Sequence, residues 1–146
     1  MIVEQLMNTS VTTCSPNDSL ARVAEIMWER DCGVVPVVDA EGRVLAMITD
    51  RDICMAAFWQ EKLLKNMPVT TASSRTVYSV DRKATLDAAE EIMRKRRVRR
   101  LPVTGDGGRL VGVLSLSDIA RHMGHRGEGI SGDEVAATLS AITHPN

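Results

Sequence analysis

The sequence predicts an α+β (α/β) fold made of two copies of one β-α-β-β-α unit. The main evidence is an internal repeat: after a shift of 66 residues, residues 19–53 align with 85–119 without a gap and with 11 identities in 35 positions. Composition alone would give roughly two or three matches. Each copy of about 60 residues would bury only a marginal core by itself. We therefore expect the two copies in this chain of 146 residues to pack on each other.

The first copy is predicted to form a helix, a hairpin and a second helix. In residues 19–30 the apolar side chains fall at helical spacing, with Asp18 or Ser19 as the N-cap. The apolar runs 34–38 and 43–48 flank turn-forming residues at 39–42, which predicts a β-hairpin. A second helix is expected from near Asp50, and residues 58–65 also have a helical pattern.

The second copy repeats this order, with a helix over 85–96, strands at 100–104 and 109–114, a glycine-rich turn between them and a helix from near Ser117. Short β-rich segments at 10–13 and 76–80 should add one strand to each small sheet. We place the first repeat at 1–62 and the second at 63–123. Residues 124–146 form a glycine-rich break and a C-terminal amphipathic helix at 133–142, which either caps the module or docks on another subunit.

The composition is that of a soluble globular protein, with 44% hydrophobic and 25% charged residues. The net charge of -1 gives no general attraction to nucleic acid or to a membrane surface. The N-terminus lacks a basic region followed by an apolar segment, and no run of 18 apolar residues occurs. We therefore expect a cytoplasmic protein.

The metal-binding residue types do not form a convincing site. Cys14, Cys32 and Cys54 show no C-x-x-C spacing and are expected to be reduced, mostly buried thiols. His122 and His125 have no third ligand within their segment, so we expect no metal. No nucleophile and base pair, P-loop or dinucleotide-binding motif is present, so the chain is not expected to be an enzyme.

The repeated motif resembles a known family. Residues 33–39 (GVVPVVD) with 42–53 (GRVLAMITDRDI), and residues 98–103 (VRRLPV) with 109–119 (RLVGVLSLSDI), resemble the CBS domain, the cystathionine β-synthase type regulatory repeat. The resemblance covers about residues 1–123. It implies a Bateman module, in which two repeats pair about a pseudo-two-fold axis through their small sheets and leave two clefts that commonly bind adenosyl ligands.

The same resemblance implies partners and ligands. Members of the family commonly form a homodimer, a disc of four CBS repeats, and regulate a partner protein, which the sequence does not identify. No cofactor is required, and AMP, ADP, ATP and S-adenosylmethionine are all candidate ligands.

The chemistry of a nucleotide site is visible in Thr49-x-x-Asp52 and Ser115-x-x-Asp118. A hydroxyl at a strand end before a helix N-terminus suits phosphate, and an ionised carboxylate in the first turn can accept hydrogen bonds from both ribose hydroxyls. In the family these positions contact phosphate and ribose respectively. The alternative is purely structural, because the same spacing forms a helix capping box.

Three arginines are candidate phosphate ligands: Arg51 next to Asp52, and Arg99 and Arg100 before Leu101. Each could equally be a solvated surface residue. The basic run 94–100 spans a helix end and a strand start without interleaved aromatic residues, so nucleic-acid binding is disfavoured. The resemblance also suggests an adenine slot in each repeat, formed by strand residues that could instead belong to the core: Thr12, Thr13, Val35 and Pro36 in the first, and Tyr78, Ser79, Leu101 and Pro102 in the second.

The sequence thus supports two functions. The first is a regulatory ligand-sensing module that binds an adenine nucleotide or a related adenosyl compound in the clefts between the repeats and signals to a partner protein. The second is a structural or protein-interaction module whose clefts are unoccupied. The retained Thr49, Asp52, Ser115 and Asp118 favour the first.

Overall fold

The computed structural model describes residues 1–74, 76–123 and 132–143 and divides into two compact units. The first-repeat unit comprises Val11–Val77 and Gly107–Leu110. The second-repeat unit comprises Met1–Ser10, Tyr78–Asp106 and Val111–Asn146. Because each unit combines segments that are distant in sequence, the units do not follow the predicted repeat boundaries at 62/63 and 123/124, which stay predictions.

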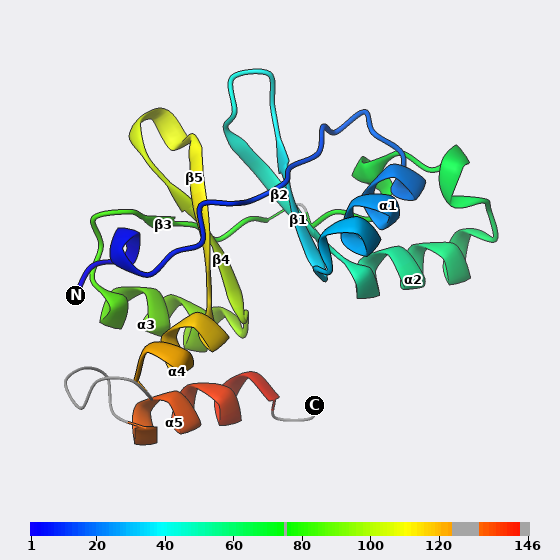
Figure 1. The fold of residues 1–146 in the computed structure, drawn as a ribbon. Coiled ribbons are helices and arrows are strands. Elements are labelled where there is room, and N and C mark those ends of the chain that lie inside the picture. The colour runs from blue at the N-terminus through cyan, green and yellow to red at the C-terminus, as the bar shows by residue number, and fades with distance from the viewer. Residues whose placement is uncertain (75, 124–131, 144–146) are drawn as a thin grey trace. The chain divides into compact units, whose positions relative to one another are not determined.

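The first-repeat unit contains the predicted helices and hairpin. Helix α1 (Leu20–Arg30) begins after Ser19, whose side chain accepts a hydrogen bond from the Arg22 backbone N–H. Strands β1 (Val34–Val38) and β2 (Val44–Thr49) form an antiparallel pair, and α2 (Asp50–Gln60) follows directly. Figure 1 shows α1 and α2 next to each other beside this hairpin. The core of the unit lies between the helices and the hairpin.

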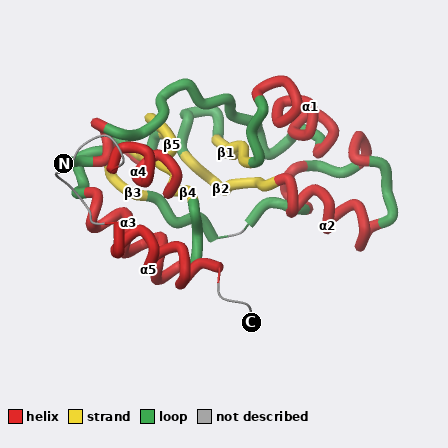
Figure 2. Tube along the Cα trace, turned by 60° about the horizontal axis from the view of Figure 1, so that its bottom comes forward, coloured by secondary structure: helices red, strands yellow, loops and turns green. Residues whose placement is uncertain are grey.

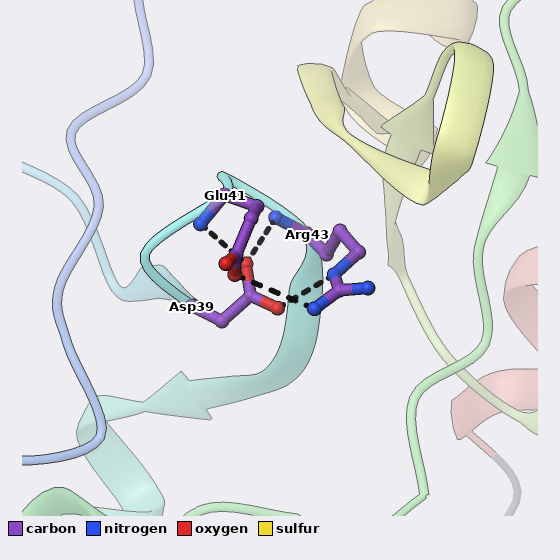
Figure 3. Close-up of polar contacts among 3 residues, drawn as sticks. All are labelled: Asp39, Glu41 and Arg43. Carbon is purple, nitrogen blue, oxygen red and sulfur yellow. Dashed lines mark hydrogen bonds and ion pairs between the residues drawn. The ribbon is translucent and has the colours of Figure 1, made fainter.

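The hairpin turn is held by charged side chains, drawn in Figure 3. The Asp39 carboxylate accepts hydrogen bonds from the Glu41 and Arg43 backbone N–H groups and from Arg43 Nε, which lies 2.7 Å from Asp39 Oδ2. Desolvation, the largest single effect, acts to raise the pKa of Asp39, but these bonds and the Arg43 charge together lower it. Gly42 has a φ of 80°, which glycine adopts without the strain that a side chain would cause.

The predicted strand at 10–13 is wrong. Only Cys14 pairs with β1, donating to the Pro36 carbonyl at 3.0 Å and accepting from the Val38 N–H at 2.9 Å. The next backbone donor in this parallel pairing would be Pro16, which has no N–H, so the pairing cannot continue. Pro16 ends the pairing after Cys14, and residues 10–13 before it form no strand.

The helical interpretation of residues 58–65 is also only partly right. Helix α2 ends at Gln60 because Glu61 adopts a left-handed conformation with a φ of 50°. Two short 3₁₀ turns follow, η2 (Leu64–Asn66) and η3 (Val69–Thr71). Nothing in the side chain of Glu61 signals this break, because left-handed residues are usually glycine or asparagine.

The second-repeat unit has the same order of elements. Strand β3 (Val80–Asp81) pairs in parallel with β4 (Arg100–Thr104), and the sheet order is β3-β4-β5, with β5 at Leu110–Ser115. The β-rich segment 76–80 thus supplies a strand only at its end. Helices α3 (Leu86–Arg96), α4 (Leu116–Met123) and α5 (Gly132–Thr143) complete the unit, which has its own core.

The N-terminal segment belongs to this second unit. A 3₁₀ turn, η1 (Val3–Gln5), places Val3 in the core, and Asn8 and Val113 exchange two backbone hydrogen bonds of 2.9 Å. Gly112 permits this contact, since a Cβ there would lie 2.8 Å from the Asn8 carbonyl oxygen and 2.8 Å from Met7 Sδ. The pairing depends on tertiary structure and could not be read from local sequence.

The predicted C-terminal helix exists and covers part of the second unit. Helix α5 packs against α3 and α4, as Figure 2 shows, and buries Val135 and Thr138. Within this chain the helix therefore covers α3 and α4 of the second-repeat unit. No helix in the described ranges combines the length and the apolar character that crossing a membrane requires.

Candidate ligand-binding sites

The first candidate site lies where β2 meets α2. Thr49 is the N-cap of α2, and its Oγ1 accepts a hydrogen bond of 3.1 Å from the Asp52 backbone N–H. Asp52 Oδ2 in turn accepts from the Thr49 N–H at 2.9 Å. Thr49 and Asp52 therefore form a capping box. Within the described ranges the second carboxylate oxygen of Asp52 makes no hydrogen bond, so it remains available to a ligand.

The strand register decides which apolar residues accompany Thr49. Val34 lies directly opposite Thr49 and Val35 opposite Ile48, and residues paired in this way project from the same face of the sheet. Val35 and Ile48 are fully buried in the core. Val34 is half-buried and shares the Thr49 face, together with Pro36, two residues along the strand.

Of the predicted adenine-slot residues in this unit, Val35 is thus on the core face, whereas Pro36 is on the Thr49 face. Thr12 and Thr13 are half-buried and immediately precede the Cys14 contact with β1. Val34 was missed by the sequence analysis, although the period-2 alternation of the strand around Thr49 could have indicated it.

The second candidate site repeats this geometry at the junction of β5 and α4. Asp118 Oδ2 accepts from the Ser115 N–H at 3.0 Å and from the Ser115 hydroxyl, and Ser115 Oγ accepts from the Asp118 N–H at 3.1 Å. Ser117 Oγ lies 2.8 Å from Ser115 Oγ. Leu101 is fully buried in the core, as is its counterpart Val35 in the first repeat.

One backbone hydrogen bond fixes each helix start against the first hairpin strand. The Asp50 N–H donates to the Gly33 carbonyl at 3.1 Å, and the Leu116 N–H donates to the Arg99 carbonyl at 2.9 Å. These are equivalent residues after the shift of 66. The bond joins the exposed Arg99, which precedes Arg100 in the chain, to the N-terminus of α4.

The charges at the two helix N-termini differ. In the first repeat the Asp50 carboxylate lies against Gly33 and accepts a hydrogen bond of 2.8 Å from the Arg51 backbone N–H. In the second repeat Leu116 replaces this acid, and the Ser117 N–H finds no acceptor among the residues that the structure describes. A free N–H beside two arginines suits an anion, whereas Asp50 repels one.

Within the part of the chain that the structure describes, the second carboxylate oxygen of Asp118 is paired, unlike that of Asp52. Asp118 Oδ1 forms an ion pair with Arg121, and Met55 is the residue at the matching position of the first repeat. Arg121 is exposed, so the pair is weak and a ligand can displace it.

The remaining adenine-slot candidates of the second repeat are Tyr78, Ser79 and Pro102. The Arg96 guanidinium lies 4.7 Å from the centre of the Tyr78 ring, a cation–π contact that the sequence analysis did not anticipate. Tyr78 is half-buried, Ser79 is exposed and Pro102 is buried. Tyr78 and Ser79 directly precede β3.

The cysteines are only partly as expected. Cys14 is buried, and desolvation, with a smaller effect of the Asp18 charge, raises its pKa to about 11, so it is an unreactive thiol. Cys32 is half-buried and Cys54 is exposed, which corrects the expectation of mostly buried thiols. In the described ranges no three His, Cys, Asp or Glu residues are grouped to hold a metal ion, and His125 lies outside those ranges.

The chain is a tandem repeat with a hydroxyl and an acid at each strand-to-helix junction, and comparison identifies its family. A family model for the CBS domain matches residues 3–58 and 69–125. The CBS domain-containing protein YhcV of Bacillus subtilis (strain 168) is 31% identical over 144 residues, which cover 99% of this chain and 96% of that protein. The chain belongs to the CBS domain family.

Solved structures agree with this family and confirm the predicted fold class. Hypoxic Response Protein I, determined with two coordinated zinc ions, is 30% identical with a TM-score of 0.77, covering 84% of this chain and 98% of that one. The CBS domain pair of protein MJ0100, in complex with 5′-methylthioadenosine and S-adenosyl-L-methionine, is 26% identical with a TM-score of 0.76. That match covers 86% of this chain and 97% of the other.

Proposed function

We propose that this chain is a regulatory, non-catalytic module of the cytoplasm that binds adenosyl compounds and signals their presence to a partner protein. The observation that carries the proposal is the Asp52 carboxylate, which caps α2 with one oxygen and leaves the other available beside Thr49 and the half-buried Val34. A carboxylate oxygen at this place can accept hydrogen bonds from ribose hydroxyls. The adenosyl ligands of the MJ0100 domain pair support the same ligand class.

The two repeats should prefer different members of that class. Asp50 beside Gly33 disfavours phosphate in the first repeat, so this site suits an uncharged or cationic compound such as adenosine, 5′-methylthioadenosine or S-adenosylmethionine. The free Ser117 N–H, together with Arg99 and Arg100, favours a phosphorylated ligand such as AMP, ADP or ATP in the second.

The ligand class can be tested by thermal shift and calorimetry with adenosine, 5′-methylthioadenosine, S-adenosylmethionine, AMP, ADP and ATP, and with GMP as a control. A ligand present at about 100 times its Kd stabilises the native state by about 2.7 kcal/mol. For a chain of this length that corresponds to a rise in Tm of roughly 5–10 °C. A selective rise for one or more adenosyl compounds is expected, and no rise at millimolar concentrations would refute the proposal.

The charge assignment has its own test, because the repeat supplies reciprocal variants. Leu116→Asp places the acid of the first repeat in the second and should weaken AMP and ATP binding while adenosine binding is retained. Asp50→Leu is the matched change and should strengthen binding of phosphorylated ligands in the first repeat. Equal effects of either change on adenosine and on ATP would contradict the assignment.

A second function is favoured by a different observation. Both acids already serve their own helix N-termini, and Asp118 is also paired with Arg121, so each is partly satisfied without a ligand. If no adenosyl compound binds, the module acts through protein contacts alone.

A further inference from the structure

The helix that follows the second site carries an arginine to which the proposed ligand contacts give no role. Arg121 lies on α4, three residues after Asp118, and its guanidinium forms an ion pair with Asp118 Oδ1. The side chain of Asp118 is only 18% exposed, whereas that of Arg121 is 74% exposed. A cation at the surface therefore holds the carboxylate to which we assign the ribose.

The hydrogen-bonding capacity of Asp118 is almost filled without a ligand. An ionised carboxylate has about four acceptor positions, shared equally by its oxygens. Among the described residues, Oδ2 accepts from the Ser115 N–H and from the Ser115 hydroxyl, and Oδ1 accepts from Arg121. About one position is then left, whereas the two adjacent hydroxyls of a ribose need one each. A ribose can therefore bind Asp118 with both hydroxyls only if Arg121 moves away.

The first repeat lacks this competition. Met55 stands at the position of Arg121. Asp52 Oδ2 accepts from the Thr49 N–H, and in the described ranges Asp52 Oδ1 accepts no hydrogen bond. The junction of strand and helix forms in the same way with either residue, so the fold at this junction does not require the arginine.

Arg121 also lies one helical turn after Ser117, whose N–H we assign to phosphate. Side chains of a helix lean toward its N-terminus, so residue 121 covers the helix surface near residues 117 and 118. A change of side-chain rotamer can therefore carry the guanidinium from the Asp118 carboxylate to an anion at the Ser117 N–H. Leu116 begins this helix, so the acid that Asp50 supplies in the first repeat does not compete for the cation here.

We infer that Arg121 determines the ligand specificity of the second site by exchanging between these two anions. Without a ligand it occupies Asp118. A phosphorylated adenosyl compound brings an anion of its own, so Arg121 transfers to the phosphate and the ribose replaces it on Asp118. Adenosine displaces Arg121 without offering another anion, and the ion pair is lost. The inference rests on the proposed function and specifies its ligand class in this repeat, which is adenosyl compounds with phosphate on the 5′ side of the ribose.

The test is isothermal titration calorimetry of adenosine and AMP with Arg121→Met, which places the residue of the first repeat in the second. All proteins carry Asp52→Ala, so that the first site lacks its ribose contact. Because an exposed ion pair contributes little, its removal should raise affinity for adenosine about two- to fivefold. Loss of the phosphate contact should lower affinity for AMP about three- to tenfold. The preference for AMP over adenosine should thus fall at least about sixfold.

The chain offers a matched control on another helix. Arg22 and Glu25 on α1 form an ion pair with the same spacing of three residues, outside both candidate sites. Arg22→Met removes the same charge and should leave the preference for AMP unchanged. Arg121→Lys retains the charge without the planar fork and should keep part of the preference. Because Arg121 and Arg22 are exposed, circular dichroism of all variants should match that of the parent.

The reciprocal change tests the competition in the first repeat. In a chain with Asp118→Ala, Met55→Arg should lower affinity for adenosine about two- to fivefold, because it supplies Asp52 with the missing competitor. A preference for AMP that Arg121→Met leaves unchanged, or that Arg22→Met reduces equally, would overturn the inference while adenosyl binding itself stands. If the parent binds neither adenosine nor AMP, both the inference and the proposed function are wrong.

Discussion

The double role of Asp52 and Asp118 gives the sharpest prediction. Asp52→Ala removes the 2.9 Å bond from the Thr49 N–H but keeps the Thr49 Oγ1 cap of 3.1 Å, so the fold should lose about 1 kcal/mol. Hydrogen bonds from ribose hydroxyls to a carboxylate are worth about 1.5–3 kcal/mol each. Affinity for an adenosyl ligand should therefore fall by at least about tenfold at the altered site.

Matched controls separate these two losses. Ser19 and Thr85 cap α1 and α3, each through a side-chain oxygen 3.2 Å from a backbone nitrogen, and neither belongs to a candidate site. Ser19→Ala and Thr85→Ala should cost about the same 1 kcal/mol without changing affinity. Such a loss lowers Tm by roughly 2–4 °C in a chain of this size.

The assay is isothermal titration calorimetry of Asp52→Ala, Asp118→Ala and the double variant, with thermal unfolding of each protein alone. Loss of affinity in the aspartate variants with retention in the controls supports the ribose role. If both single variants and the double variant bind like the parent, the ribose assignment is wrong. If the cap controls lose affinity equally, the effect comes from stability and the argument from the carboxylate fails.

The remaining predictions concern packing, pH and salt. Gly112→Ala should destabilise the protein by about 1–3 kcal/mol in urea unfolding, because the added Cβ would meet the N-terminal segment. Ala46, the counterpart of Gly112 in the first repeat, shows that the repeat itself tolerates a methyl group at this position. An unchanged urea midpoint would refute the close contact. The pKa of Cys14 is raised to about 11 from its ordinary value of 9.0, so the thiol contributes stability that is complete below pH 9 and is lost between pH 9 and 11. The loss amounts to about 1–2 kcal/mol after solvent screening. The stability of Cys14→Ala should fall less steeply over this pH range, and identical stability profiles would refute the burial effect. Affinity for ATP should fall faster with ionic strength than affinity for adenosine, and Arg99→Ala should reduce that difference; equal salt slopes in the parent would exclude a phosphate role for Arg99.

Local signals predicted the regular elements well. The runs that became β1 and β4 were predicted with their observed bounds, α1 begins directly after the expected cap Ser19, and α3 begins one residue after the predicted start at Thr85. These elements have hydrophobic periodicity and cap residues within a few positions of one another, which is the information that sequence patterns contain.

Features that depend on distant contacts were not predictable in the same way. The N-terminal segment joins the second-repeat unit because Asn8 pairs with Val113, about 100 residues away, at a place where Gly112 leaves room. Helix α2 ends before the left-handed Glu61, whose side chain does not signal such an end, whereas the ends of α1 and α3 were predicted. In these cases the surrounding packing, and not local preference, selects the conformation.

The candidate site shows the same division. Its polar pairs were predictable, since Thr49-x-x-Asp52 and Ser115-x-x-Asp118 combine a fixed spacing with a known capping geometry. The apolar neighbours were predicted only in part: Pro36 was among the predicted residues, whereas Val34 was missed because the strand register was not known. The pairing of Val34 with Thr49 assigns Val34 to the site face and Val35 to the core.

The repeat also indicates why we propose different ligand preferences for the two sites. The backbone contacts between Asp50 and Gly33 and between Leu116 and Arg99 are equivalent, so the helix N-termini are held in the same way. The side chains at these positions are an acid and a glycine in one repeat and a leucine and an arginine in the other. Since these backbone contacts are the same, we assign the proposed difference in ligand preference to the side chains. Each repeat is therefore the natural control for the other, and exchanging single residues between them tests the charge of each site without redesigning the fold.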